Sequence, residues 1–111
     1  MIHLSLALAA VLAAAPAAPA GGGQGVIAFG MGRQTCTQWL ASPASTAEGG
    51  AWLLGYWSAV NLLNEGNHMV GRQVGSDGVV DGVREVCGAT PDDTLMDAAA
   101  LVYFRFQQDG K

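Results

Sequence analysis

Charged side chains are scarce in this chain: Asp, Glu, Lys and Arg make up 13% of its 111 residues. Basic residues are the scarcest, because five Lys and Arg face nine Asp and Glu and leave a formal net charge of −4. Nucleic-acid-binding proteins neutralise backbone phosphates with clustered Lys and Arg. The composition therefore excludes a partner of that kind. The length allows one domain, which also excludes a multidomain enzyme.

Residues that carry catalysis or hold metals are equally scarce. Of the two histidines, His3 lies in the apolar N-terminal run and His68 has no second His at metal-ligand spacing. No serine sits in a Gly-x-Ser-x-Gly elbow, and Gly30-Met31-Gly32-Arg33 is not followed by the Gly-Lys-Ser/Thr of a phosphate loop. Asp92 and Asp93 are adjacent, and adjacent helical residues do not face each other. The sequence predicts no enzyme activity, no cofactor and no metal.

Only one long apolar run is present, from Ile2 to Ala15, and it is too short to span a membrane comfortably. Pro16 and Pro19 break the run, and Ala18-Pro19-Ala20 then fits a signal-peptidase site followed by glycines. This layout predicts a signal peptide over residues 1–20 that is cleaved near Ala20. The mature protein should be periplasmic or secreted, without stable membrane insertion after processing. An uncleaved N-terminal anchor is the alternative, since the segment before the run has no Lys or Arg.

Cysteine is limited to Cys36 and Cys87. An exported protein enters an oxidising compartment, and two cysteines allow a single intramolecular disulfide. A zinc site is the competing interpretation, but these cysteines and His68 supply too few ligands. A redox-active pair is disfavoured because the spacing is far from Cys-x-x-Cys. We predict a disulfide that closes a long loop.

Apolar residues recur at helical spacing after a Gly-rich N-terminal segment, residues 21–34, in which residues 26–29 are expected to be extended. The rest, residues 35–108, is predicted to be an all-α domain. Four helices are expected. The first covers 36–41 after Thr35 as its cap, and the second follows the Ser45–Glu48 capping box and ends at about Asn64. The third covers 78–87 after Ser76 or Asp77 and stops at Gly88, and the fourth runs from Thr90-Pro91 to about Gln108.

The second of these helices is apolar on most of its surface, which predicts that it is the central and most buried one. Gly55 lies inside it, although glycine costs about 1 kcal/mol relative to alanine in a helix. We expect a neighbouring element to pack closely at Gly55 and compensate for that cost.

The longest polar connection runs from Glu65 to Gly75. Long loops are frequent binding surfaces, so this loop and the helix end before it supply the candidate partner-binding residues. A simple flexible crossover is the alternative. Asn61 and Asn64 also have a structural interpretation, hydrogen bonding to the helix end or the loop. The candidates are Asn64, Asn67, His68 and Arg72.

One combination of features covers residues 34–106. It consists of Cys36-x-x-Trp39-Leu40, a helix with Leu54-Gly55-Tyr56, a valine-rich helix ending in Cys87, and an Ala-rich last helix after Pro91. This combination resembles the Tai/Rap-type immunity proteins of type VI secretion amidase effectors. It is similar in layout to the Hde-type periplasmic acid-stress chaperones.

The resemblance implies a compact four- to five-helix domain in which one disulfide, Cys36–Cys87, ties the first helix to the third. It also implies a protein that binds and blocks a peptidoglycan amidase in the periplasm, often as a homodimer. The second hypothesis is an acid-stress holdase-type chaperone, although those proteins are rich in Lys and this chain is not. The third is a structural envelope protein without a toxin partner.

Overall fold

The structure is a computed structural model that describes residues 25–111. The signal peptide predicted over residues 1–20, its cleavage near Ala20 and residues 21–24 of the Gly-rich segment lie outside the described residues. Within the described part, the chain is helical and has no strand, so the predicted all-α class is confirmed.

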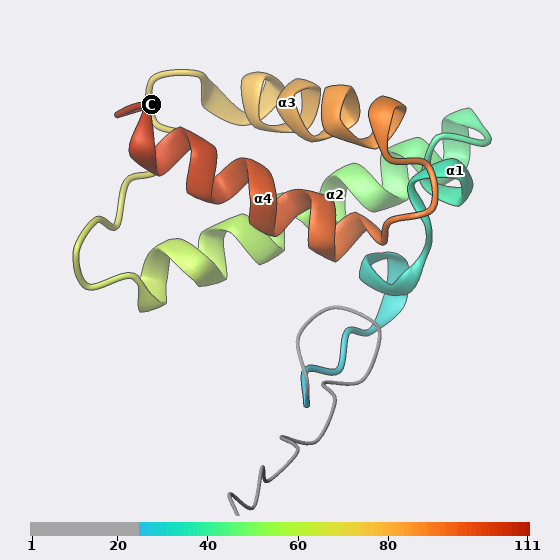
Figure 1. The fold of residues 1–111 in the computed structure, drawn as a ribbon, viewed down its shortest axis with the longest axis horizontal. Coiled ribbons are helices and arrows are strands. Elements are labelled where there is room, and N and C mark those ends of the chain that lie inside the picture. The colour runs from blue at the N-terminus through green and yellow to red at the C-terminus, as the bar shows by residue number, and fades with distance from the viewer. Residues whose placement is uncertain (1–24) are drawn as a thin grey trace, which may run out of the picture.

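Four α-helices follow a short 3-10 helix in the order η1 (Gly30–Arg33), α1 (Cys36–Trp39), α2 (Pro43–Leu63), α3 (Gly75–Ala89) and α4 (Leu95–Gln108). The long helices α2 and α4 run in the same direction, and α3 runs in the opposite direction (Figure 1). The connection between α2 and α3 therefore lies at the same end of the bundle as the C-terminus of α4. The sequence did not predict η1, which packs against α2 and α4.

Local signals explain where α1 and α2 begin. Thr35 caps α1 as predicted, in a capping box with Gln38. The predicted cap of α2 is wrong, because α2 begins at Pro43 and Ser42 is its N-cap. Ser42 is extended and its hydroxyl accepts the backbone N–H of Ser45, while Pro43 occupies the first helical position that proline favours. The end of α2 at Leu63, with Asn64 as C-cap, agrees with the prediction.

Three other predicted boundaries are wrong. Helix α3 begins at Gly75, ahead of both predicted caps, and continues through Gly88 to Ala89. Helix α4 begins at Leu95, where the Thr94 hydroxyl accepts the backbone N–H of Asp97. The segment from Thr90 to Asp93 forms a turn instead, because its carbonyl groups accept hydrogen bonds from the start of α1.

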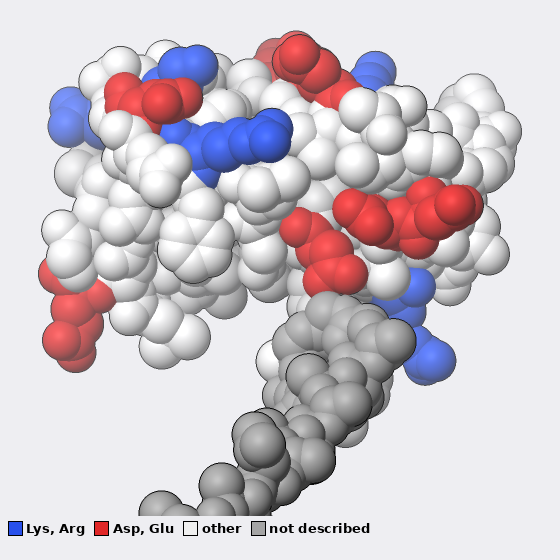
Figure 2. Space-filling view, viewed as in Figure 1, with Lys and Arg blue, Asp and Glu red and all other residues white. Residues whose placement is uncertain are grey.

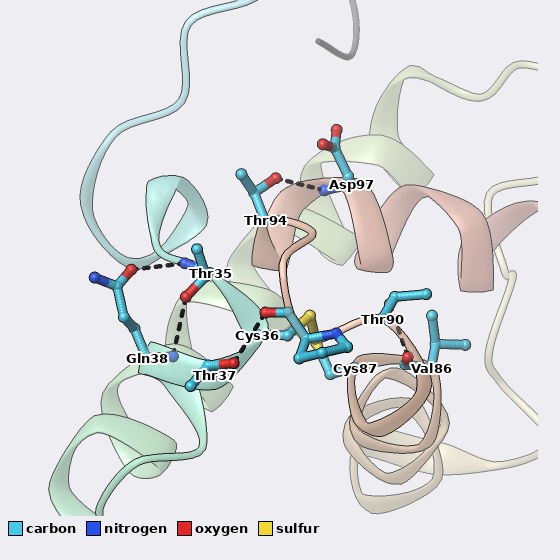
Figure 3. Close-up of a disulfide and its surroundings, with 10 residues drawn as sticks. Thr35, Cys36, Thr37, Gln38, Val86, Cys87, Thr90, Thr94 and Asp97 are labelled. Carbon is cyan, nitrogen blue, oxygen red and sulfur yellow. Dashed lines mark hydrogen bonds between the residues drawn. A yellow bond between two sulfur atoms is a disulfide. The ribbon is translucent and has the colours of Figure 1, made fainter.

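These contacts join the start of α1 to the segment before α4, next to the disulfide (Figure 3). The backbone N–H of Cys36 donates to Asp93 O at 2.7 Å, and the N–H of Leu95 donates to Gln34 O at 2.9 Å. Both the N–H and the hydroxyl of Thr37 donate to Pro91 O, at 3.1 Å each. The predicted bond between Cys36 and Cys87 is confirmed, and it links α1 to α3.

The core is formed by apolar side chains from all four α-helices, and no polar or charged residue of the described part is buried. Charged groups lie scattered over the surface seen in Figure 2. The expectation that the second helix is the most buried is wrong. Five residues of α4 are buried, whereas α2 buries Gly49, Leu53 and Trp57 and exposes Leu62 and Leu63 at its end.

The close approach expected at Gly55 is found six residues earlier, at Gly49. A Cβ on Gly55 would meet nothing within 4 Å, so that expectation is wrong. A Cβ on Gly49 would lie 2.1 Å from Cδ1 of Trp39, which is fully buried. The Trp39 indole N–H donates to Thr46 O at 3.1 Å, which fixes the ring against α2. Gly49 therefore lets α1 pack directly on α2.

Candidate functional site

A network of polar side chains holds the connection between α2 and α3. The carbonyl group of Val70 accepts hydrogen bonds from the Trp57 indole N–H at 2.8 Å and from Asn61 Nδ2 at 3.1 Å. The Tyr103 hydroxyl in turn donates to Asn61 Oδ1 at 2.8 Å. Val70 itself is 2% exposed. These bonds anchor the middle of the connection to α2, and Tyr103 joins α4 to the same network.

Two of the four candidate partner-binding residues use their polar groups within this network. Asn64 donates to the Tyr103 hydroxyl and to Gln107 Oε1, and its Oδ1 accepts the backbone N–H of Asn67. Asn67 Oδ1 accepts the N–H of Met69 at 2.9 Å. The structural interpretation of Asn61 and Asn64, hydrogen bonding at the helix end and in the loop, is confirmed.

The other two candidates, His68 and Arg72, are exposed and line one shallow pocket of about 290 Å³. We call it the loop pocket. It lies between the connection, α2 and the start of α3, and the connection also contributes the exposed side chain of Met69. Its floor is apolar and is formed by Leu54, Trp57, Val70 and Val79.

The hydrogen-bonding state of these side chains is set by their neighbours. His68 Nδ1 lies 2.9 Å from Asn61 O. A carbonyl oxygen only accepts, so Nδ1 is the donor in this contact. One Arg72 nitrogen lies 3.9 Å from Sδ of Met69, a weak contact that leaves the other guanidinium donors for a bound molecule. The loop pocket thus places a guanidinium donor, an imidazole ring and a thioether side by side.

A second surface feature, a groove between α2 and α4, was not predicted. Its volume is about 330 Å³, and Leu63 and Phe104 on its rim are 79% and 65% exposed. We call it the α2/α4 groove. Its lining contains no charged side chain and consists of Tyr56, Val60, Leu63, Asn64, Ala100, Tyr103, Phe104 and Gln107. Figure 2 shows this part of α2 and α4 as largely uncharged surface.

Tyr56 lies at the end of the groove nearest to η1. Its ring stacks on Trp52 with centroids 5.3 Å apart. Burial raises the pKa of the Tyr56 hydroxyl above its ordinary value, and the negative charge of Asp97 and the neighbouring Tyr103 add to the rise. The hydroxyl therefore stays a neutral hydrogen-bond donor across the physiological pH range.

The sequence contained a signal for this groove, namely an apolar stripe on α2 that includes Trp52, Tyr56 and Leu63. Helical periodicity alone does not show whether such a stripe faces a core or solvent. Here the core is filled by the other stripe, which contains Leu53 and Trp57, and Leu63 remains at the surface.

Groups of three or more His, Cys, Asp or Glu that could hold a metal ion do not occur among residues 25–111. In the same part of the chain, no helix is both long and apolar enough to cross a membrane. Comparison of the chain with protein-family models, with curated proteins and with solved structures finds no match.

Proposed function

We propose that this chain is an exported binding protein of the immunity type, which recognises a protein partner through the loop pocket and thereby blocks it. The observation that carries the proposal is the composition of the pocket: Arg72, His68 and Met69 stand around an apolar floor. Interfaces between proteins combine an apolar centre with a polar rim and are enriched in Arg and Met. The pocket can accept one apolar side chain of a partner whose neighbouring groups bond to Arg72 and His68.

The disulfide supports a location outside the cytoplasm, because such bonds persist in oxidising compartments. Export to the periplasm after cleavage near Ala20 is part of the proposal. The partner that we propose is a secreted peptidoglycan amidase, following the resemblance of residues 34–106 to the amidase immunity proteins. Blocking an enzyme needs a complementary surface and no chemistry of the inhibitor's own.

The experiment is an inhibition assay with the exported, disulfide-bonded protein and candidate amidases, beginning with any amidase encoded beside its gene. Inhibition at a near-equimolar ratio is expected. The substitutions Arg72→Ala and His68→Ala should each weaken it, because they remove groups from the rim of the loop pocket. Arg is enriched among the hot spots of interfaces, and truncation of a hot-spot residue costs about 2 kcal/mol or more, which weakens binding by about thirtyfold.

The matched control is Arg84→Ala. Arg84 is also exposed, but it lies on α3 and lines a different surface depression, beside Pro43 and Val80. The control should inhibit as well as the unmodified protein. The proposal fails if no amidase from the organism or its competitors is inhibited, or if Arg84→Ala and Arg72→Ala weaken inhibition equally. Suppression of protein aggregation at acid pH, without amidase inhibition, would instead identify a holdase-type chaperone.

A further inference from the structure

The residues before η1 form an exposed apolar segment, Val26–Phe29, which we call the arm. Val26, Ile27 and Phe29 are 60%, 75% and 75% exposed. Phe29 has an extended backbone, and glycines with positive φ stand on both sides of the arm at Gly25 and Gly30. Three large apolar side chains in water on one short segment are costly unless another surface covers them.

The same chain presents an open apolar surface, the α2/α4 groove. In Figure 1 the arm leads away from α2 and α4 beyond η1, so it does not enter the groove of its own bundle. We propose that the arm of one copy occupies the α2/α4 groove of a second copy, and that the exchange is reciprocal. A reciprocal exchange buries both arms and both grooves and closes a dimer with two-fold symmetry.

The dimensions of the two features agree. Four extended residues span roughly 13 Å at about 3.3 Å per residue. The lining of the groove on α2 extends from Tyr56 to Leu63, which is roughly 10 Å along a helix at about 1.5 Å per residue. Alternate side chains of an extended segment point to opposite sides, so Ile27 and Phe29 share one side and can lie along the groove together.

The charges also agree. Neither the arm nor the lining of the groove contains a charged residue, so docking buries no unpaired charge. Asp97 acts electrostatically on Tyr56 and thus lies near one end of the groove. The exposed Arg33 follows the arm in η1, so an arm docked with its η1 end toward Tyr56 would bring this cation near Asp97.

The first experiment is sedimentation equilibrium of the exported, disulfide-bonded protein. It compares two neighbouring leucines of α2 with nearly the same exposure, 75% for Leu62 and 79% for Leu63, of which only Leu63 lines the groove. The unmodified protein should dimerise. Leu63→Asp and Ile27→Asp should each weaken dimerisation by about tenfold or more, because each places a charge in the docked arm or its groove. Leu62→Asp should leave dimerisation unchanged.

A second experiment identifies which copy supplies the arm. In a chain carrying both Ile27→Cys and Leu63→Cys, docking in a second copy produces disulfide-linked dimers on a non-reducing gel. A linked species of monomer size would show that the arm docks in its own groove and would overturn the proposal. A monomeric unmodified protein, or equal effects of Leu62→Asp and Leu63→Asp, would overturn it as well. These measurements do not involve the loop pocket, so their outcome is independent of the proposed partner.

Discussion

Substitution of two glycines in α2 distinguishes a close helix contact from an open surface. Alanine is favoured over glycine in a helix by about 1 kcal/mol. Gly55→Ala should therefore stabilise the protein by up to about 1 kcal/mol, because the new methyl group meets nothing within 4 Å. Gly49→Ala places the same methyl group 2.1 Å from Cδ1 and 2.4 Å from Nε1 of Trp39.

Trp39 cannot easily give way, because its ring is fully buried and its N–H is bonded to Thr46 O. Overpacking a core costs about 1–3 kcal/mol, and contacts this short belong near the upper end of that range. After the helix-propensity gain of about 1 kcal/mol is subtracted, Gly49→Ala should destabilise the protein by about 2 kcal/mol. The two variants should then differ by about 3 kcal/mol, or by about 12–24 °C in Tm for a domain of this size.

The assay is urea unfolding of both variants, followed by tryptophan fluorescence and by circular dichroism. Equal slopes with separated midpoints would mean that the difference is one of stability. The reasoning is refuted if Gly49→Ala is as stable as Gly55→Ala, since α1 would then not be packed directly against Gly49. Gly50→Ala is a further control on the adjacent residue, where a Cβ also meets nothing within 4 Å.

Three further predictions concern the covalent link, the polar network and the groove. Replacing both Cys36 and Cys87 with Ala should lower the free energy of unfolding by about 4 kcal/mol, since the bond closes a loop of 51 residues. Chemical unfolding of the oxidised protein and the variant measures this difference, and equal midpoints would contradict it. Tyr103→Phe removes the donor to Asn61 Oδ1 and should cost about 1–3 kcal/mol in the same assay, whereas an unchanged midpoint would show that water replaces the hydroxyl. Burial, together with Asp97 and Tyr103, raises the pKa of Tyr56 above 10.0. The folded chain therefore keeps a proton that the unfolded chain loses, so the free energy of unfolding should fall as the pH rises past about 10. Tyr56→Phe should reduce that alkaline fall, as measured by unfolding and by tyrosinate absorbance, and an unchanged dependence would contradict the assignment.

Local capping patterns predicted the start of α1 correctly and the start of α2 three residues too late, whereas the start of α4 depends on distant residues and was not predicted. The Thr35–Gln38 capping box is complete within four residues, and α1 begins where it predicts. Ser42 and Ser45 both offer a cap for α2. Ser42 is used, and Ser45 is the third helical residue of its capping box, in which the Ser45 hydroxyl accepts the backbone N–H of Ser42.

The start of α4 could not be predicted from the residues next to it. Thr90-Pro91-Asp92-Asp93 is a good local start signal, but its carbonyl groups bind the N–H groups of Cys36 and Thr37. These donors are more than 50 positions away in the sequence, so no local pattern reports them. The close contact at Gly49 was not predictable either. Gly49 and Gly55 look alike in the sequence, and only the position of Trp39 shows that Gly49 is the one with no room for a side chain.

The loop pocket and the α2/α4 groove also differ in how far the sequence predicts them. The polar loop identified His68 and Arg72, which the fold brings to one pocket. The loop pocket itself depends on the floor that α2 and α3 provide. The α2/α4 groove depends on which of two apolar stripes of α2 the core uses, a choice made by tertiary packing rather than by periodicity.

The hydrogen bonds between the start of α1 and the segment before α4 have a consequence for the order of folding. Helix α2 and the connection that follows it can form from contacts close in sequence. The pairing of residues 34–37 with residues 91–95 instead closes most of the domain into one loop, and closing a long loop is slow because its entropy is lost before its contacts form. Cys36 and Cys87 lie beside this pairing and become neighbours through the same closure. Oxidation of the cysteines should therefore accompany the last step of folding, because a chain that ends before residue 95 contains both cysteines but lacks the buried side chains of α4.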